Sequence, residues 1–191
     1  MKLFIESADA EEIRRCLDFY PIDGVMLPST VERDAAKKII GAIGEDRELH
    51  IPIDGLRAED IADEARRLVG ALGTNIYVGI AVGVEGLKAM QMLNSSEVSF
   101  AATGVGTSMQ ALMAGKCGAS YIMPFVNRLD SRNAVSLVEK MIAALKNNGL
   151  ETEVIAARFK TARQAIEVAE YGIDALSVAP SMLPSLIADG F

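Results

Sequence analysis

The feature that most constrains this chain is an alternation, repeated eight times, of short β-rich runs with helical patterns. The expected strands are 2–6, 24–27, 48–53, 75–80, 97–102, 120–125, 152–157 and 174–178. Several are almost continuously apolar, which is typical of parallel strands covered on both faces. Strict alternation predicts an α/β fold with a parallel sheet. Eight units favour a small, closed (β/α)₈ TIM barrel that takes in residues 1–191 as a single domain.

A doubly wound open sheet is the alternative fold for the same alternation. The first expected strand is followed by no G-x-G-x-x-G string, which counts against a dinucleotide site in such a sheet. Between the strands, apolar residues recur at helical spacing over 61–72 and over 138–145. Capping boxes, Thr107-x-x-Gln110 and Thr161-x-x-Gln164, mark two of the expected helix starts.

Composition excludes several classes of partner. The net charge is −7 and lysine and arginine form no block, so nucleic acids and anionic membranes are poor partners. No apolar run reaches the roughly 20 residues of a membrane span, and the N-terminus turns acidic at Glu6, unlike a secretory signal. Cys16 and Cys117 are expected to be buried free thiols of a cytoplasmic protein. With one histidine and no paired Cys/His spacing, we expect no metal and no other cofactor.

In a barrel of this kind, chemistry takes place at the C-terminal ends of the strands. Polar residues are scarce after the first five expected strands and cluster after the sixth and seventh, in 127–130 and 158–160. The glycine-bearing turn TGVGTS (103–108) could bind an anion through its backbone N–H groups. It could equally be a tight turn between a strand and a helix.

Five segments give the chain a family resemblance: LFIESAD (3–9), DGVMLPS (23–29), VEGLKAM (84–90), PFVNRLD (124–130) and AARFKTARQA (156–165). They resemble the transaldolase family, and in particular its short subgroup that includes fructose-6-phosphate aldolase. The resemblance implies a barrel that handles sugar phosphates. In the family, a lysine on strand four forms a Schiff base with the keto substrate.

The chain departs from the family pattern where the chemistry takes place. The EGL string at 85–87 fixes the register and puts Gly79 at the position of the Schiff-base lysine. Glu6 stands for an aspartate of strand one, and Phe125 for a tyrosine that positions a catalytic water. Pro28, or a deletion, replaces an asparagine of strand two, and Pro52 falls near a polar residue of strand three. Since glycine offers no amine, the resemblance predicts a site without the parent chemistry.

Other residues keep an anion-binding character. Arg128 stands at the family's phosphate-binding arginine, and Thr103 at a threonine of strand five. Arg158 replaces a small residue, usually serine, after strand seven. Two guanidinium groups on adjacent strands can clamp a phosphate or carboxylate, although Arg128 could instead pair with Asp130 or a helix end. Ser181, after the eighth strand, is a further candidate for substrate binding.

Four more residues are candidates with an ordinary alternative. Lys160 and Lys88 could supply a relocated amine, although Lys88 is expected to face solvent. Glu6 and Asp54 could form a new acid/base pair, or serve as caps and solvated loop residues. His50 is expected to be a satisfied structural histidine near the start of strand three, at the end of the barrel that stabilises the fold.

Three functions follow from these residues. The first is a changed enzyme that acts on a sugar phosphate or a related small anion without a Schiff base. The second is a non-catalytic protein that binds a phosphorylated metabolite, and the third is an aldolase or transaldolase with a relocated lysine. The family also implies a homo-oligomer, an expectation weakened because the sequence ends at LIADGF, before a further helix. Without side chains at Gly79 and Gly83, we expect a wider barrel mouth between strands three and five.

Overall fold

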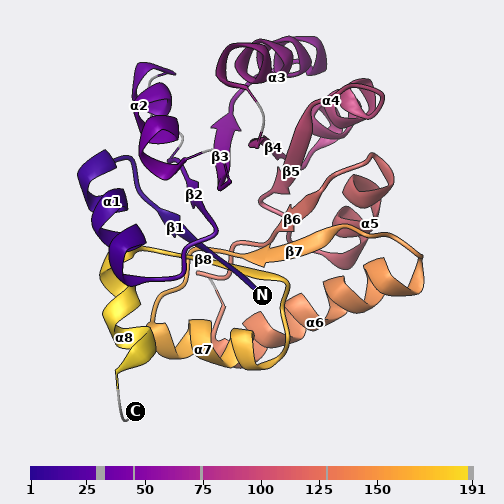
Figure 1. Ribbon diagram of the computed structural model, residues 1–191. Coiled ribbons are helices and arrows are strands. Elements are labelled where there is room, and N and C mark those ends of the chain that lie inside the picture. Colours follow the sequence, from indigo (N-terminus) through magenta and orange to yellow (C-terminus); the bar gives the residue numbers. More distant parts are fainter. Residues whose placement is uncertain (29–32, 45, 74, 128, 189–191) are drawn as a thin grey trace.

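Eight parallel strands form a closed barrel surrounded by helices (Figure 1). The computed structural model describes residues 1–28, 33–44, 46–73, 75–127 and 129–188, with the backbone alone for 33 and 34. The strands are β1 (Lys2–Glu6), β2 (Gly24–Met26), β3 (Glu48–Ile53), β4 (Ile76–Ala81), β5 (Ser99–Thr103), β6 (Tyr121–Met123), β7 (Glu153–Ala156) and β8 (Ala175–Val178). The helices are α1 (Ala10–Phe19), α2 (Arg33–Ile43), α3 (Ala58–Leu72), α4 (Val84–Leu93), α5 (Ser108–Lys116), α6 (Ser131–Asn147), α7 (Ala162–Glu170), a 3₁₀ turn η1 (Pro180–Met182) and α8 (Leu183–Ile187).

The pairing of β1 closes the barrel. Phe4 of β1 is in register with Gly24 of β2 on one side and with Ser177 of β8 on the other. Because the first and last strands pair, the (β/α)₈ prediction is confirmed and the open doubly wound sheet is wrong. Each expected strand is present, with its ends displaced by at most two residues.

The helices follow the apolar patterns of the sequence. Helix α3 buries Ile61, Ala65 and Leu68 against the barrel. The expected caps are also present, since the Thr107 and Thr161 hydroxyls each accept a hydrogen bond of 3.2 Å from a backbone N–H at the third helical position. In a capping box the glutamine side chain accepts from the N–H of the threonine itself. Here Gln110 and Gln164 accept instead from the residue before the threonine, Gly106 and Lys160 respectively.

Alternate residues of each strand point into the barrel, and they form layers. At the N-terminal end lies a polar layer, in which Lys2 is hydrogen-bonded to Glu48, Tyr121 and Glu153. Next comes an aromatic layer of Phe4, His50, Tyr77 and Tyr121. Gly24 has no side chain because a Cβ there would lie 2.8 Å from the Phe4 ring and 2.3 Å from the Glu48 carbonyl. Side chains of these two layers therefore fill the middle of the barrel, below the cavity at the C-terminal end.

Two sequence expectations concern the rest of the molecule. Cys16 and Cys117 are buried and unbridged, as predicted. Among the described helices, none is long and apolar enough to cross a membrane.

Candidate functional site

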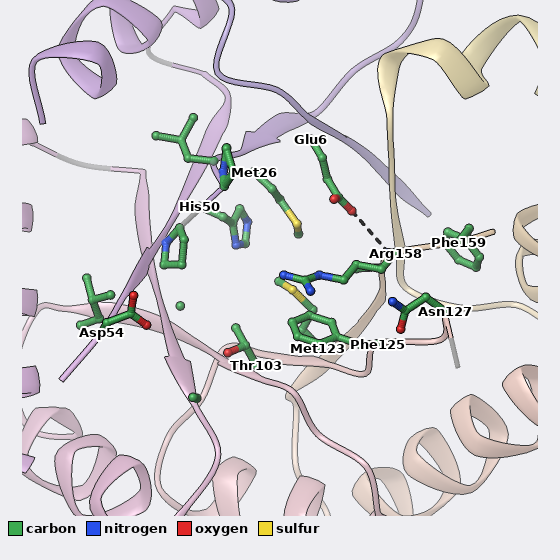
Figure 2. Close-up of a pocket in the computed structure, with 17 residues that line it drawn as sticks. Glu6, Met26, His50, Asp54, Thr103, Met123, Phe125, Asn127, Arg158 and Phe159 are labelled. Atoms are coloured by element: carbon green, nitrogen blue, oxygen red, sulfur yellow. Dashed lines mark hydrogen bonds between the residues drawn. The ribbon is translucent and has the colours of Figure 1, made fainter. Parts of the chain in front are cut away.

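A cavity of about 660 Å³ opens at the C-terminal end of the barrel (Figure 2). Seven of the eight strands, or the residues just after them, contribute to its wall. The lining residues are Glu6, Met26, Leu27, Pro28, His50, Pro52, Ile53, Asp54, Gly79, Ala81, Thr103, Met123, Phe125, Asn127, Ala157, Arg158 and Phe159. Five predicted site residues, Glu6, Asp54, Thr103, Phe125 and Arg158, thus meet in one cavity with Gly79.

Arg158 is the cation in the described part of this wall. A bridge between Phe125 and Ala157 extends the pairing of β6 and β7 beyond Met123 and Ala156, and Arg158 follows directly after it. The Arg158 guanidinium carbon lies 4.1 Å from the centroid of the Phe125 ring. Figure 2 shows the side chain extending over this ring into the cavity, toward Met26 and His50. The backbone of Arg158 has a φ of 61°, a left-handed conformation that is uncommon outside glycine.

Glu6 closes the cavity beside Arg158. Its Oε1 atom accepts a hydrogen bond of 3.2 Å from the Ser177 hydroxyl and a longer one, 3.4 Å, from the backbone N–H of Arg158. Asp54 lies on the opposite side of the cavity and is exposed (Figure 2). The two carboxylates therefore face one space, and a ligand between them could contact both.

Gly79 lines the cavity with its backbone. A Cβ atom at Gly79 would lie 3.2 Å from Cγ2 of Thr103 and 3.3 Å from Cα of Pro52. Thr103 and Pro52 therefore pack closely beside the glycine, and a wider mouth stays a prediction. Gly83 differs, because a Cβ there would meet open space. Phe125 presents only carbon atoms to the cavity, where a tyrosine would present a hydroxyl.

The two candidate lysines lie away from the cavity. None of the described residues that line it is a lysine. Lys88 forms an ion pair of 2.6 Å with Glu59, which joins α4 to α3 on the outside of the barrel as expected for a solvent-facing residue. Lys160 is exposed, and its backbone N–H donates a hydrogen bond to Oε1 of Gln164. Ser181 lies in η1 and is exposed, outside the cavity lining.

Arg128 lies outside the described residues. The segments on both sides of it are tied down by buried Gln164, whose Nε2 donates to the carbonyls of Val126, at 3.4 Å, and Leu129, at 3.2 Å. Asp130 caps α6 by accepting from the N–H of Asn133 at 2.9 Å. Gln164 therefore fixes the loop after β6 to the start of α7.

Two backbone N–H groups of the turn at 103–108 are already hydrogen-bonded to other groups of the protein. The N–H of Gly106 donates to the Gln110 side chain at 2.8 Å, and the N–H of Val105 donates to the Met123 carbonyl at 3.4 Å. These contacts favour the tight-turn interpretation over anion binding.

His50 is the residue that the sequence interpretation misplaced. It is 3% exposed and lies in the middle of β3, where it lines the floor of the cavity. Its Nε2 atom is 3.1 Å from Oε2 of Glu48, but its buried Nδ1 has no hydrogen-bond partner among the described residues. The expectation of a fully satisfied histidine is therefore wrong. Asn127, also absent from the predicted site, lines the rim of the cavity.

Burial and the neighbouring charges determine the protonation state and tautomer of His50. Burial lowers the pKa of His50, so the imidazole is neutral near pH 7. Burial disfavours the charged form of Glu48, but hydrogen bonds from His50, Lys2 and Tyr121 outweigh it and lower the pKa of this carboxyl. Burial likewise opposes the charge on Lys2, but its three hydrogen bonds raise the pKa of the amine. An ionised carboxylate only accepts hydrogen bonds, so the His50 proton is on Nε2.

This arrangement can bind a small anion and can accept hydrogen bonds. Arg158 supplies the positive charge, Glu6 and Asp54 supply carboxylates, and Thr103 and Asn127 supply neutral polar groups. Within the described ranges, no group of three histidine, cysteine, aspartate or glutamate residues is placed to hold a metal ion.

Comparisons with known proteins find one family. The family model described as "Transaldolase/Fructose-6-phosphate aldolase" matches residues 26–190. A "Probable transaldolase" of Hydrogenobaculum sp. (strain Y04AAS1) is 32% identical over 195 residues, which cover 97% of this chain and 88% of the relative. A second, of Prosthecochloris aestuarii (strain DSM 271 / SK 413), is 33% identical and covers 98% of this chain and 90% of the relative.

A solved structure confirms the architecture alone. A "putative isomerase" from Sinorhizobium meliloti, in an open loop conformation, superposes with a TM-score of 0.70 at 10% sequence identity. The match covers 97% of this chain and 52% of that one, so this chain spans about half of its structural neighbour.

Proposed function

This chain belongs to the transaldolase/fructose-6-phosphate aldolase family, and we propose that its barrel cavity binds a sugar phosphate, or a similar small anion, without forming a Schiff base. The observation that carries this proposal is the composition of the cavity wall. It contains the Arg158 guanidinium, but no lysine among its described residues. A Schiff base requires an amine within bonding distance of the substrate carbonyl.

Arg158 is the proposed anion-binding group. Its guanidinium extends into the cavity over Phe125, which orients its planar donors before a ligand arrives. Such a fork matches the oxygens of a phosphate or carboxylate. From the family resemblance we propose Arg128 as a second phosphate ligand, with Thr103 as a neutral one.

The first test is binding by isothermal titration calorimetry with fructose 6-phosphate and with inorganic phosphate. We expect both to bind the wild type, and the Arg158→Ala variant to bind them at least tenfold more weakly. Lys160→Ala is the matched control, since it removes an exposed cation from the same loop outside the cavity. Equal affinities of Arg158→Ala and wild type would contradict the role of Arg158.

The second test is borohydride trapping with intact-mass detection, with dihydroxyacetone, dihydroxyacetone phosphate and fructose 6-phosphate as probes. We expect no adduct, while a lysine-bearing relative treated in parallel is trapped. An adduct mapped to Lys88 or Lys160 would overturn the proposal in favour of a relocated amine. Both lysines lie outside the lining, which supports the expected result.

A catalytic role within the same cavity is a second candidate, favoured by Glu6. Its carboxylate reaches into the cavity from β1, and Oε1 is held by Ser177. A carboxylate held this way can accept or donate a proton on a bound sugar. If the wild type turns over a sugar phosphate and Glu6→Gln binds it without turnover, the chain is a changed enzyme. If the wild type itself binds sugar phosphates without turnover, the chain is a metabolite-binding protein.

A further inference from the structure

We propose that His50 recognises a hydroxyl group of the bound ligand, with Nδ1 as the hydrogen-bond acceptor at the floor of the cavity. The proposal rests on the proposed function and names the ligand class more closely. The ligand would carry an anion at one end, for Arg158, and a hydroxyl at the other.

The first step of the argument is the orientation of the imidazole. Glu48 and His50 are two residues apart on β3, so their side chains lie on the same, inward face of the strand. Oε2 of Glu48 accepts a hydrogen bond from the Nε2–H group of His50, with 3.1 Å between the two atoms. The ring also stacks on Tyr77, with 4.9 Å between centroids and 13° between planes, and the edge of Phe4 packs at 4.9 Å. The imidazole is thus held in one orientation and one tautomer.

The second step is the unused lone pair. With the proton on Nε2, Nδ1 is an acceptor, and it is buried without a partner among the described residues. Buried polar atoms are nearly always satisfied in native proteins, so Nδ1 calls for a partner that the described residues do not supply, a water or a ligand group. Since His50 borders the cavity, a donor group of the ligand can take the place of such a water.

The third step is the choice of donor. Nδ1 can only accept, which excludes a carboxylate, an ionised phosphate and a ketone oxygen as its partner. A hydroxyl fits, and sugar phosphates carry hydroxyls at a distance from the phosphate. Figure 2 shows the Arg158 side chain extending toward the side of the cavity where Met26 and His50 lie, so one ligand could contact both. Met26 borders His50, and its unbranched side chain can move to admit the hydroxyl.

The experiment uses two probes that differ by one hydroxyl, dihydroxyacetone phosphate and hydroxyacetone phosphate. We expect the wild type to bind dihydroxyacetone phosphate about tenfold more tightly, the ratio that one good hydrogen bond provides. His50→Phe keeps an aromatic ring against Tyr77 but loses the acceptor, so its two affinities should be equal. His50→Gln, whose amide can donate to Glu48 and accept with its oxygen, should recover part of the preference.

A second readout does not depend on a variant that folds. Since the chain has a single histidine, ¹⁵N-histidine labelling reports on His50 alone. We expect the free protein to show the neutral Nε2–H tautomer, and saturation with dihydroxyacetone phosphate to move the Nδ1 resonance upfield. Hydroxyacetone phosphate should leave it in place.

Each failure has its own meaning. If both probes bind with equal affinity and Nδ1 does not respond, the role of His50 is overturned while the proposed anion binding stands. If neither probe binds while fructose 6-phosphate and inorganic phosphate do, this inference fails and the proposed anion binding stands. If none of the four binds, the proposed function fails and this inference fails with it.

Discussion

Arg158 lies on the loop that joins β7 to α7, and its guanidinium carbon is 4.1 Å from the centroid of the Phe125 ring. The Phe125 ring thus holds the Arg158 guanidinium in the cavity. The family resemblance implies a tyrosine at position 125. The contact therefore joins two residues, Phe125 and Arg158, that the resemblance marks as departures from the family pattern. This relationship leads to the first prediction.

Truncation of the ring should weaken anion binding less than loss of the cation. A cation–π contact at an exposed site contributes about 0.5–1 kcal/mol. Phe125→Leu should therefore lower the affinity for fructose 6-phosphate about two- to fivefold, whereas Phe125→Tyr, which keeps the ring, should retain it. Calorimetric titration measures both, and an unchanged affinity in Phe125→Leu would mean that the ring does not position Arg158.

The backbone of Arg158 makes a separate prediction about stability. Its φ of 61° costs a residue with a side chain about 1 kcal/mol relative to glycine. Arg158→Gly should therefore be about 1 kcal/mol more stable than Arg158→Ala in urea denaturation, although neither binds the anion. Equal midpoints and slopes for the two variants would argue that the left-handed conformation is not maintained in solution.

His50 predicts how stability depends on pH. Its pKa is lowered in the folded state by burial, below the 6.5 of the unfolded chain. Below pH 6.5 the unfolded state binds a proton that the folded state rejects, so acidification favours unfolding. The free energy of unfolding should fall by up to about 1.4 kcal/mol per pH unit between pH 6.5 and 5.

The control is His50→Phe, which should show little change over the same interval. Glu48, whose pKa is also lowered on folding, contributes stability above an unfolded value of 4.5 and loses it only at more acidic pH. Urea titrations at half-unit pH steps separate the two effects. A wild-type profile that is flat down to pH 5 would contradict a neutral, buried His50.

Gly79 predicts a coupling between neighbouring strands. A Cβ there would lie 3.2 Å from Cγ2 of Thr103 and 3.3 Å from Cα of Pro52, both closer than an ordinary contact. We expect Gly79→Ala to destabilise the fold by about 1 kcal/mol, because the cost of overpacking outweighs the stabilisation that alanine gives by lowering the conformational entropy of the unfolded chain. The cost should be smaller in a Thr103→Ser background, which removes Cγ2 but keeps the hydroxyl. A double-mutant cycle measures this coupling, and strict additivity would exclude the contact.

The next prediction concerns Gln164, which ties the loop after β6 to the start of α7. Its buried amide donates to the carbonyls of Val126 and Leu129 and accepts from Lys160. Gln164→Ala should cost about 2 kcal/mol of stability, because buried carbonyls lose their donors. Hydrogen exchange should then increase in the loop after β6 more than in β1. Gln110→Ala is a matched control, since Gln110 caps the corresponding turn after β5 without joining two loops.

Much of this protein follows from its sequence. The eight alternations, the near-continuous apolar strands and the capping residues define a parallel (β/α)₈ barrel, because periodicity and end signals are local properties of the chain. The family segments and the glycine at position 79 are likewise properties of the sequence itself. They lead to the cavity at the C-terminal ends of the strands, and to Glu6, Asp54, Thr103 and Arg158 as residues that line it.

The tertiary structure decided how these residues meet. The register between β3, β4 and β5 brings Pro52 and Thr103 close to Gly79, so even a Cβ atom there would be crowded. The inward face of β3 places His50 on the cavity floor, where Glu48 binds one ring nitrogen and none of the described residues binds the other. Residue identity and spacing place Glu48 and His50 on one face of β3, but they could not reveal the contacts around Gly79, because those depend on the register between separate strands. Their geometry is set by closure of the barrel, which fixes the register and the inward face of every strand at once.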